Sequence, residues 1–153
     1  MTGPDRAAFH LPGHPLPALI NLDACGVGVD LFMESLSAPV LLCAHHPGSD
    51  SARYLASLNA SLSALQAQKP GLRVYGLSTS KPRDWSWGFP LLHDSAATLT
   101  KALELPADGN PPALRLCTMI LKEGQITRVD YPVPPEQAGS RALELLKRDD
   151  GLL

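Results

Sequence analysis

The sequence predicts an α/β fold in which a central mixed β-sheet is flanked by helices in three α/β/α layers. Short apolar runs alternate with stretches of helical period along the 153 residues, a pattern typical of this class. Residues 40–44 and 72–77 enclose such a stretch, which predicts two parallel strands joined by a right-handed crossover. Residues 114–121 and 126–130 are separated by a short glycine-containing turn, which predicts an antiparallel hairpin.

The first half of the chain is expected to hold two strands and one long helix. The strands are residues 27–32 and 40–44. The helix follows a polar turn, runs to about Gln68 and is ended by Pro70 and Gly71. Its apolar residues recur at i, i+3, i+7 and i+10 and form one stripe of four leucines, Leu55, Leu58, Leu62 and Leu65. This stripe predicts a helix that packs one face on the sheet.

The second half is expected to alternate strands and helices up to the C-terminus. The expected elements are a strand at 72–77, a helix at 96–103, a strand at 114–121, a turn at 122–125, a strand at 126–130 and a helix at 140–148. A parallel strand pair with a helical crossover, followed by an antiparallel hairpin, is the thioredoxin-like layout. The order of elements therefore predicts a thioredoxin-like three-layer fold.

Composition and charge exclude several classes of protein. Hydrophobic residues make up 44% of the chain, which is enough for a buried core and excludes a disordered chain. No apolar run approaches the roughly 18 residues that indicate a membrane span. A formal net charge of −2 with mixed signs argues against nucleic acid or a membrane surface as a partner. We expect one domain over residues 1–153, with residues 1–11 as a flexible N-terminus.

The three cysteines, Cys25, Cys43 and Cys117, form neither a Cys-x-x-Cys motif nor a zinc-binding spacing. The first residues lack the basic-then-apolar pattern of a signal peptide, and the odd number of cysteines predicts a reducing compartment. We therefore expect a cytoplasmic protein without cofactor or metal. Cys43 lies in the middle of a predicted strand and is expected to be inert. Cys25 stands beside Gly26 in a predicted turn, where an exposed thiol would oxidise most easily.

The most informative segment is residues 47–54, Pro-Gly-Ser-Asp-Ser-Ala-Arg-Tyr. It joins a predicted strand to a predicted helix, with Asp50 or Ser51 as the expected N-cap. Backbone N–H groups at such a helix N-terminus favour a negatively charged ligand such as a small anion; the resemblance described next implies a hydroperoxide as the other candidate ligand. The segment resembles the active-site loop of the peroxiredoxins, Pro-x-x-x-Thr/Ser-x-x-Cys. Pro47 matches the proline, Ser51 matches the hydroxyl residue, and Tyr54 stands where the family has its peroxide-attacking cysteine.

The resemblance extends from about residue 12 to residue 147. The family's Phe-Pro-Leu-Leu-Ser-Asp run is matched by residues 89–94, Phe-Pro-Leu-Leu-His-Asp. Its Arg-x-x-x-x-Ile-x-x-x-Gly strand is matched in spacing by residues 115–124, which begin with Arg115. These two runs are the specific parts of the match. The resemblance implies a thioredoxin-like fold and an ancestral reduction of hydroperoxides by thiols.

Tyr54 decides what the resemblance implies for activity. The family's cycle needs a thiolate that attacks the peroxide and is oxidised to a sulfenic acid. A phenol, with a pKa of about 10, cannot replace it, so the usual cycle cannot run at this position. Two functions stay open: a divergent thiol peroxidase that uses Cys117 or Cys43, or a non-catalytic module for binding or dimerisation. A cysteine restored at position 54 is expected to have a low pKa, because of the helix N-terminus and Arg115.

Several candidate residues have a structural and a functional interpretation. Tyr54 is either a plug in the core or a redox-active or ligand-binding phenol. Arg115 either forms a structural ion pair with Asp50 or Asp94, or keeps an anion-binding role. Cys117 is expected to share a strand face with Arg115. It is then either a thiol of lowered pKa near the loop or a small buried hydrophobe.

Three histidines and two tryptophans complete the candidates. His45 and His46 are adjacent and should point to opposite faces, so at most one of them can join His93 in a metal site. Trp85 and Trp87 form a pair of loop aromatics that either packs on the edge of the domain or anchors a homodimer.

Overall fold

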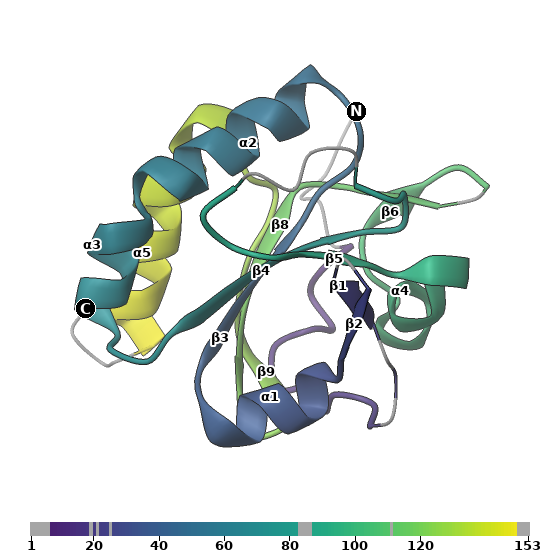
Figure 1. Cartoon of the computed structure of the whole chain (residues 1–153), viewed down its shortest axis with the longest axis horizontal. Helices are drawn as coiled ribbons and strands as arrows, with labels where there is room; N and C mark the ends of the chain where they lie inside the picture. Colours follow the sequence, from purple (N-terminus) through teal and green to yellow (C-terminus); the bar gives the residue numbers. More distant parts are fainter. Residues whose placement is uncertain are drawn as a thin grey trace.

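A seven-stranded mixed sheet forms the centre of the structure, a computed structural model that describes residues 7–18, 20, 22–24, 26–82, 87–110 and 112–149 (Figure 1). The strand order is β2-β1-β5-β4-β3-β8-β9. The strands are β1 Leu22–Ala24, β2 Val27–Val29, β3 Val40–Ala44, β4 Arg73–Ser78, β5 Leu91–His93, β8 Cys117–Lys122 and β9 Gln125–Asp130. A separate two-stranded sheet joins β6 Ala107–Asp108 to β7 Ala113–Leu114.

The central strands follow the predicted topology. Strands β3, β4 and β5 are parallel, whereas β8 is antiparallel to β3 and places Cys117 opposite Ala44. The hairpin β8–β9 is closed by Glu123 and Gly124, both with positive φ. Two successive left-handed residues are what a tight hairpin turn requires. The mixed sheet, the crossover and the hairpin are therefore confirmed.

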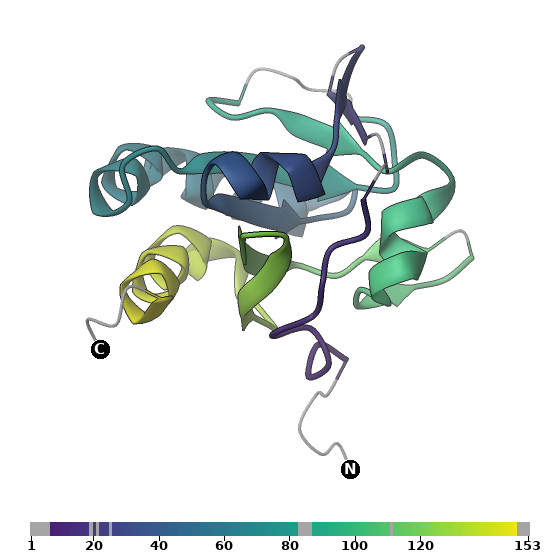
Figure 2. The same ribbon diagram turned by 90° about the horizontal axis from the view of Figure 1, so that it is seen from below.

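Helices cover both faces of the sheet and divide the core in two. They are α1 Leu31–Ser37, α2 Ser49–Ala60, α3 Leu62–Gln68, α4 Thr98–Leu103 and α5 Ala138–Asp149, with 3-10 turns at Ser95–Ala97 and Pro135–Gln137. Figures 1 and 2 show α2, α3 and α5 together on one side and α4 on the opposite side. We call the cores the α2-side core, which holds Leu41, Cys43 and Leu58, and the α4-side core, which holds Leu42, Leu99 and Cys117. None of the described helices has the length and apolar character of a membrane span.

Two predicted boundaries are wrong for local reasons. Residues 31 and 32, expected in a strand, begin α1, because the Asp30 carboxylate accepts hydrogen bonds from the N–H groups of Phe32 and Met33 at 3.0 and 3.4 Å. The long helix divides at Ser61 into α2 and α3. Its leucine stripe nevertheless faces the core as predicted, with Leu58 and Leu65 fully buried.

Part of the N-terminal segment expected to be flexible is packed. Leu11 is fully buried in the α4-side core. The N–H of Gly13 donates to the carbonyl of Ile126 at 2.6 Å, and the N–H of Leu16 to that of Gly124 at 2.8 Å. Residues 7–11 thus include packed side chains, residues 1–6 lie outside the described residues, and the flexibility of the N-terminus stays a prediction.

The predicted strand at 114–121 is interrupted after Leu114. This residue ends β7, which pairs with β6, and β8 begins only at Cys117. Between them, the N–H of Arg115 donates to the carbonyl of Pro106 at 2.9 Å. Arg115 therefore lies outside the central sheet.

Candidate functional site

The loop between β3 and α2 has the predicted position and a different cap. Helix α2 begins at Ser49, and its N-cap is Gly48, whose φ of 145° suits glycine. The prediction of Asp50 or Ser51 as N-cap is wrong, because both lie inside the helix. The Ser51 hydroxyl instead accepts a hydrogen bond from the N–H of His46 at 3.0 Å and ties the loop to the first turn of α2. Pro47 lies in this loop between His46 and Gly48, and it lines the cavity described below.

Tyr54 is held inside the α2-side core. Its side chain has no exposed surface. The hydroxyl donates to the carbonyl of Cys117 at 3.1 Å and lies 2.8 Å from Oγ1 of Thr118, both in β8. Burial raises the pKa of the Tyr54 phenol well above its usual value. Tyr54 is thus a neutral phenol that joins α2 to the central strand β8.

Arg115 forms an ion pair that the sequence did not predict. Its guanidinium makes a two-point contact with Asp108, at 2.8 and 2.6 Å, and donates to the Tyr131 hydroxyl at 2.8 Å. The bonds to Asp108 raise the pKa of Arg115 and lower that of Asp108. A structural ion pair was one of the two interpretations of Arg115, but its partner is Asp108 and not Asp50 or Asp94. The Asp50 carboxylate pairs with Arg53. The Asp94 carboxylate accepts hydrogen bonds from the N–H groups of Leu99 and Thr100.

Cys117 and Cys43 lie on opposite faces of the sheet. Cys117 belongs to the α4-side core, away from α2, and is fully buried. Burial raises the pKa of its thiol, so of the two interpretations of Cys117 the small buried hydrophobe agrees with the structure. The expected shared strand face with Arg115 is wrong, because β8 begins only at Cys117. Cys43 lies in the α2-side core beside Tyr54, and burial raises its pKa to about 12. Both thiols are core residues, and Cys25 lies outside the described residues.

The three candidate histidines diverge. His46 Nδ1 bonds to the carbonyl of Leu114 at 2.7 Å, and His93 Nε2 to that of Thr79 at 3.2 Å. His45 is buried, with 6% of its surface exposed, and its Nε2 has no hydrogen-bond partner. Burial, together with charge repulsion from His46, lowers the pKa of His45 to about 4, so its imidazole is neutral at pH 7. Within the described part of the chain, no three His, Cys, Asp or Glu side chains form a group that could hold a metal.

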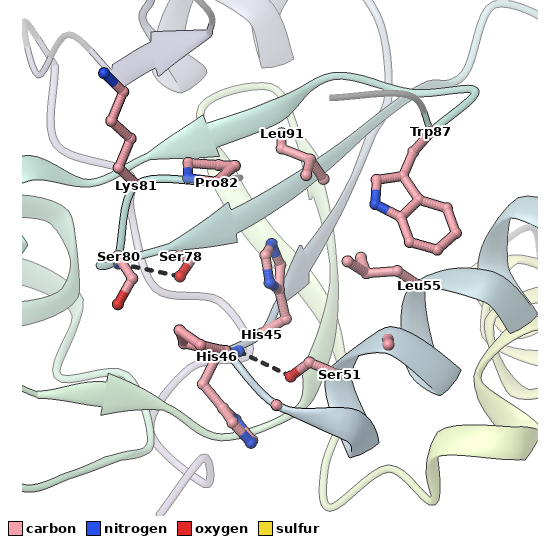
Figure 3. Close-up of a pocket in the computed structure, with 13 residues that line it drawn as sticks. His45, His46, Ser51, Leu55, Ser78, Ser80, Lys81, Pro82, Trp87 and Leu91 are labelled. Carbon is pink, nitrogen blue, oxygen red and sulfur yellow. Dashed lines mark hydrogen bonds between the residues drawn. The ribbon is translucent and has the colours of Figure 1, made fainter. Parts of the chain in front are cut away.

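A cavity of about 770 Å³ opens beside the N-terminal half of α2 (Figure 3). Its walls come from the loop before α2, from α2 itself, from the end of β4 with the residues that follow, and from β5. The lining residues are His45, His46, Pro47, Gly48, Ser51, Ala52, Leu55, Ser78, Ser80, Lys81, Pro82, Trp87 and Leu91. Most of these residues lie in segments that the sequence already indicated, whereas the residues at and after the end of β4 were missed: Ser78, Ser80, Lys81 and Pro82. The signal that could have found them is their place directly after the predicted strand at 72–77, in the same position as the loop that follows the predicted strand at 40–44.

Trp87 is half-buried and lines this cavity. It also packs against the α2-side core. Trp85 lies outside the described residues, so the aromatic pair and its homodimer contact stay predictions.

No protein-family model and no curated protein matches the chain, whereas solved structures do. A cysteine-to-serine mutant of PrxQ from Xylella fastidiosa is 17% identical, with a TM-score of 0.76 over 92% of this chain and 98% of that one. The fold is that of the peroxiredoxins. The bacterioferritin comigratory protein of Xanthomonas campestris is 18% identical, with a TM-score of 0.74 over 97% and 98% of the two chains. Reduced Prx3 from Vibrio vulnificus is 21% identical, with a TM-score of 0.72 over 89% and 97%.

Proposed function

We propose that this chain is a non-catalytic protein of the peroxiredoxin fold, one that lacks the thiol peroxidase cycle and acts as a binding module. The observation that carries the proposal is Tyr54. The motif aligns it with the peroxide-attacking cysteine, and its hydroxyl is bound to β8 in the core. A phenol cannot be oxidised to a sulfenic acid and recycled by a second thiol. In contrast, the Xanthomonas campestris protein of the same fold has alkyl peroxide reduction activity.

The two described thiols support the same conclusion. The thiolate is the form that attacks a peroxide. A thiol with the pKa of about 12 found for Cys43 is ionised at neutral pH to roughly one part in 10⁵. Cys117 is fully buried on the face of the sheet away from α2, and its pKa is also raised. Neither thiol has the exposed, electropositive setting of a reactive cysteine.

A peroxidase assay tests the proposal. We expect the purified protein, supplied with a dithiol reductant and either hydrogen peroxide or an alkyl hydroperoxide, to consume peroxide no faster than the reductant alone. The same assay is run on the single variants Cys25→Ser, Cys43→Ser and Cys117→Ser. Turnover above the control that is lost in Cys117→Ser or Cys43→Ser would establish a divergent peroxidase and overturn the proposal. Turnover lost only in Cys25→Ser would overturn it too, and would assign the chemistry to Cys25.

A further inference from the structure

Two histidines near the N-terminus, His10 and His14, lie side by side at the surface. Their ring centroids are 6.3 Å apart, with the ring planes at 81°. His10 is exposed and His14 is half-buried, so an ion from the solvent can reach both rings. Neither ring lines the cavity beside α2. The pair is therefore a second group of possible ligands, separate from the residues described above.

The backbone around His14 is held by the rest of the fold. The N–H of His14 donates to the carbonyl of Leu11 at 2.9 Å, and its carbonyl accepts from the N–H of Ile126 in β9 at the same distance. Leu11, which lies between the two histidines in the chain, is fully buried in the α4-side core. Figure 2 shows this segment, in purple, passing the β8–β9 hairpin. A ligand held on a fixed backbone loses less conformational entropy when it binds an ion.

A backbone carbonyl fixes the tautomer of each ring. His10 Nε2 lies 2.8 Å from the carbonyl oxygen of Leu103, and His14 Nδ1 lies 2.7 Å from that of Pro15. A carbonyl oxygen can only accept, so both of these ring nitrogens carry the hydrogen. In the neutral rings, the lone pairs are then on His10 Nδ1 and His14 Nε2. Histidines that bind metals have this arrangement, in which one nitrogen donates to a carbonyl or carboxylate and the other binds the ion.

The separation of the rings favours a metal that binds two imidazoles on opposite sides. A metal–nitrogen bond is about 2.0–2.1 Å long. Two imidazoles in a tetrahedral site would therefore have centroids roughly 5 Å apart, and two on opposite sides of the ion roughly 6.4 Å apart. The observed 6.3 Å agrees with the second arrangement. Copper(II) and nickel(II) adopt tetragonal geometries that allow it, and copper(II) binds nitrogen ligands more tightly than nickel(II) does.

We propose that His10 Nδ1 and His14 Nε2 bind one copper(II) ion, with water molecules as the remaining ligands. Among the described residues, no group of three His, Cys, Asp or Glu side chains could hold a metal, so water is the expected ligand at the other positions. Imidazole is a ligand that suits copper. This inference goes beyond the proposed function, because it involves neither Tyr54 nor a thiol and is independent of peroxide turnover.

Calorimetric titration of the untagged protein with copper(II) tests the proposal. All samples carry Cys25→Ser, so that this thiol neither binds nor reduces the ion. We expect one saturable site per chain, which binds copper(II) more tightly than nickel(II) or zinc(II). His10→Gln and His14→Gln should each lower the affinity by about tenfold or more, because a single imidazole no longer chelates the ion. Glutamine keeps an N–H for the backbone carbonyl and removes the nitrogen with the lone pair.

The matched control is His93→Gln. His93 Nε2 also lies against a backbone carbonyl, that of Thr79, at 3.2 Å, and this variant should bind copper(II) as tightly as Cys25→Ser alone. Pulsed electron paramagnetic resonance of the copper-loaded protein counts the bound imidazoles, and we expect two. Absence of a saturable site, a single bound imidazole, tighter binding of zinc(II), or equal affinities in the three glutamine variants would overturn the proposal.

Discussion

At the scale of single residues, Tyr54 connects helix α2 to strand β8 through its hydroxyl group. The spacing of Tyr54 from Pro47 and Ser51 is visible in the sequence and matches the family's motif, which is why we propose that it stands in the cysteine position. The motif could not show where the hydroxyl lies, since its partners, Cys117 and Thr118, are more than 60 residues away along the chain. The residue that we propose stands in the nucleophile position is therefore also a cross-link between α2 and β8.

The hydroxyl of Tyr54 should contribute measurably to stability. Tyr54→Phe leaves the Thr118 hydroxyl and a carbonyl of β8 without their partner in the core, at a cost of about 1–2 kcal/mol in the free energy of unfolding. Chemical denaturation measures it. Tyr131→Phe is the matched control, because the Tyr131 hydroxyl is only partly buried and water can replace it. Equal losses in the two variants would contradict the role of Tyr54.

A cysteine restored at position 54 should be unreactive, contrary to the expectation from the sequence. The new thiol would lie in a buried site beside Cys43, whose own pKa is about 12, and the Arg115 guanidinium is engaged by Asp108 and Tyr131. Loss of the ring also leaves a cavity, which typically costs about 3–5 kcal/mol. Alkylation of native Tyr54→Cys at stepped pH, read by mass spectrometry, should give a pKa above about 8.5, the value for a free cysteine. A lower value would restore the sequence-based interpretation.

His45 should make the protein less stable in mild acid. Its pKa is lowered from 6.5 to about 4 on folding, so below pH 6.5 the unfolded chain binds the proton more strongly than the folded chain does. Stability therefore falls as the pH is lowered towards 4, by about 3 kcal/mol in total from this residue. Denaturation of wild type and His45→Phe at stepped pH isolates this contribution. An unchanged pH dependence in the variant would show that His45 does not carry it.

At the scale of elements, the sequence predicted those helices and turns that depend on residues close together in the chain. The leucine stripe of α2 and α3 and the glycine turn of the β8–β9 hairpin are short-range signals, and both are confirmed. The break after Leu114 was not predictable in this way, because it depends on pairing between β7 and β6 and on a bond from Arg115 to Pro106. The cap of α1 by Asp30 was a local signal that the strand assignment overlooked.

The contact between α2 and α5 should not tolerate a side chain at Gly139. A Cβ there would lie 2.1 Å from Ser61 Oγ and 2.5 Å from the backbone carbonyl oxygen of Ser57. Gly139→Ala should therefore reduce the free energy of unfolding by about 1–3 kcal/mol, even though alanine favours a helix. Ser140→Ala, at an exposed position next to it, should change stability by less than about 0.5 kcal/mol. A neutral Gly139→Ala would mean that α2 and α5 pack less closely.

At the scale of the whole molecule, the fold was predictable and the site only in part. Alternating apolar runs and helical stretches determine a layered α/β sheet, and solved peroxiredoxin structures have the same fold. The arrangement of the candidate site residues depends on which face of the sheet each side chain lies on. The central strand begins at Cys117, three residues after the predicted start at 114, so Arg115 lies outside it, and Cys117 belongs to the α4-side core. The cavity is lined in part by residues that follow β4, whose place beside α2 depends on tertiary packing.

The central claim is that this chain carries no peroxide-reactive thiol in its described core and no nucleophile at position 54. The most direct measurement is the oxidation state of each cysteine after brief exposure of the native protein to hydrogen peroxide, with sulfenic acid trapped and quantified by mass spectrometry. We predict that Cys43 and Cys117 stay reduced in the native protein and react only once it is unfolded, because burial suppresses their thiolates. Rapid formation of a sulfenic acid at either residue in the folded protein would contradict the account.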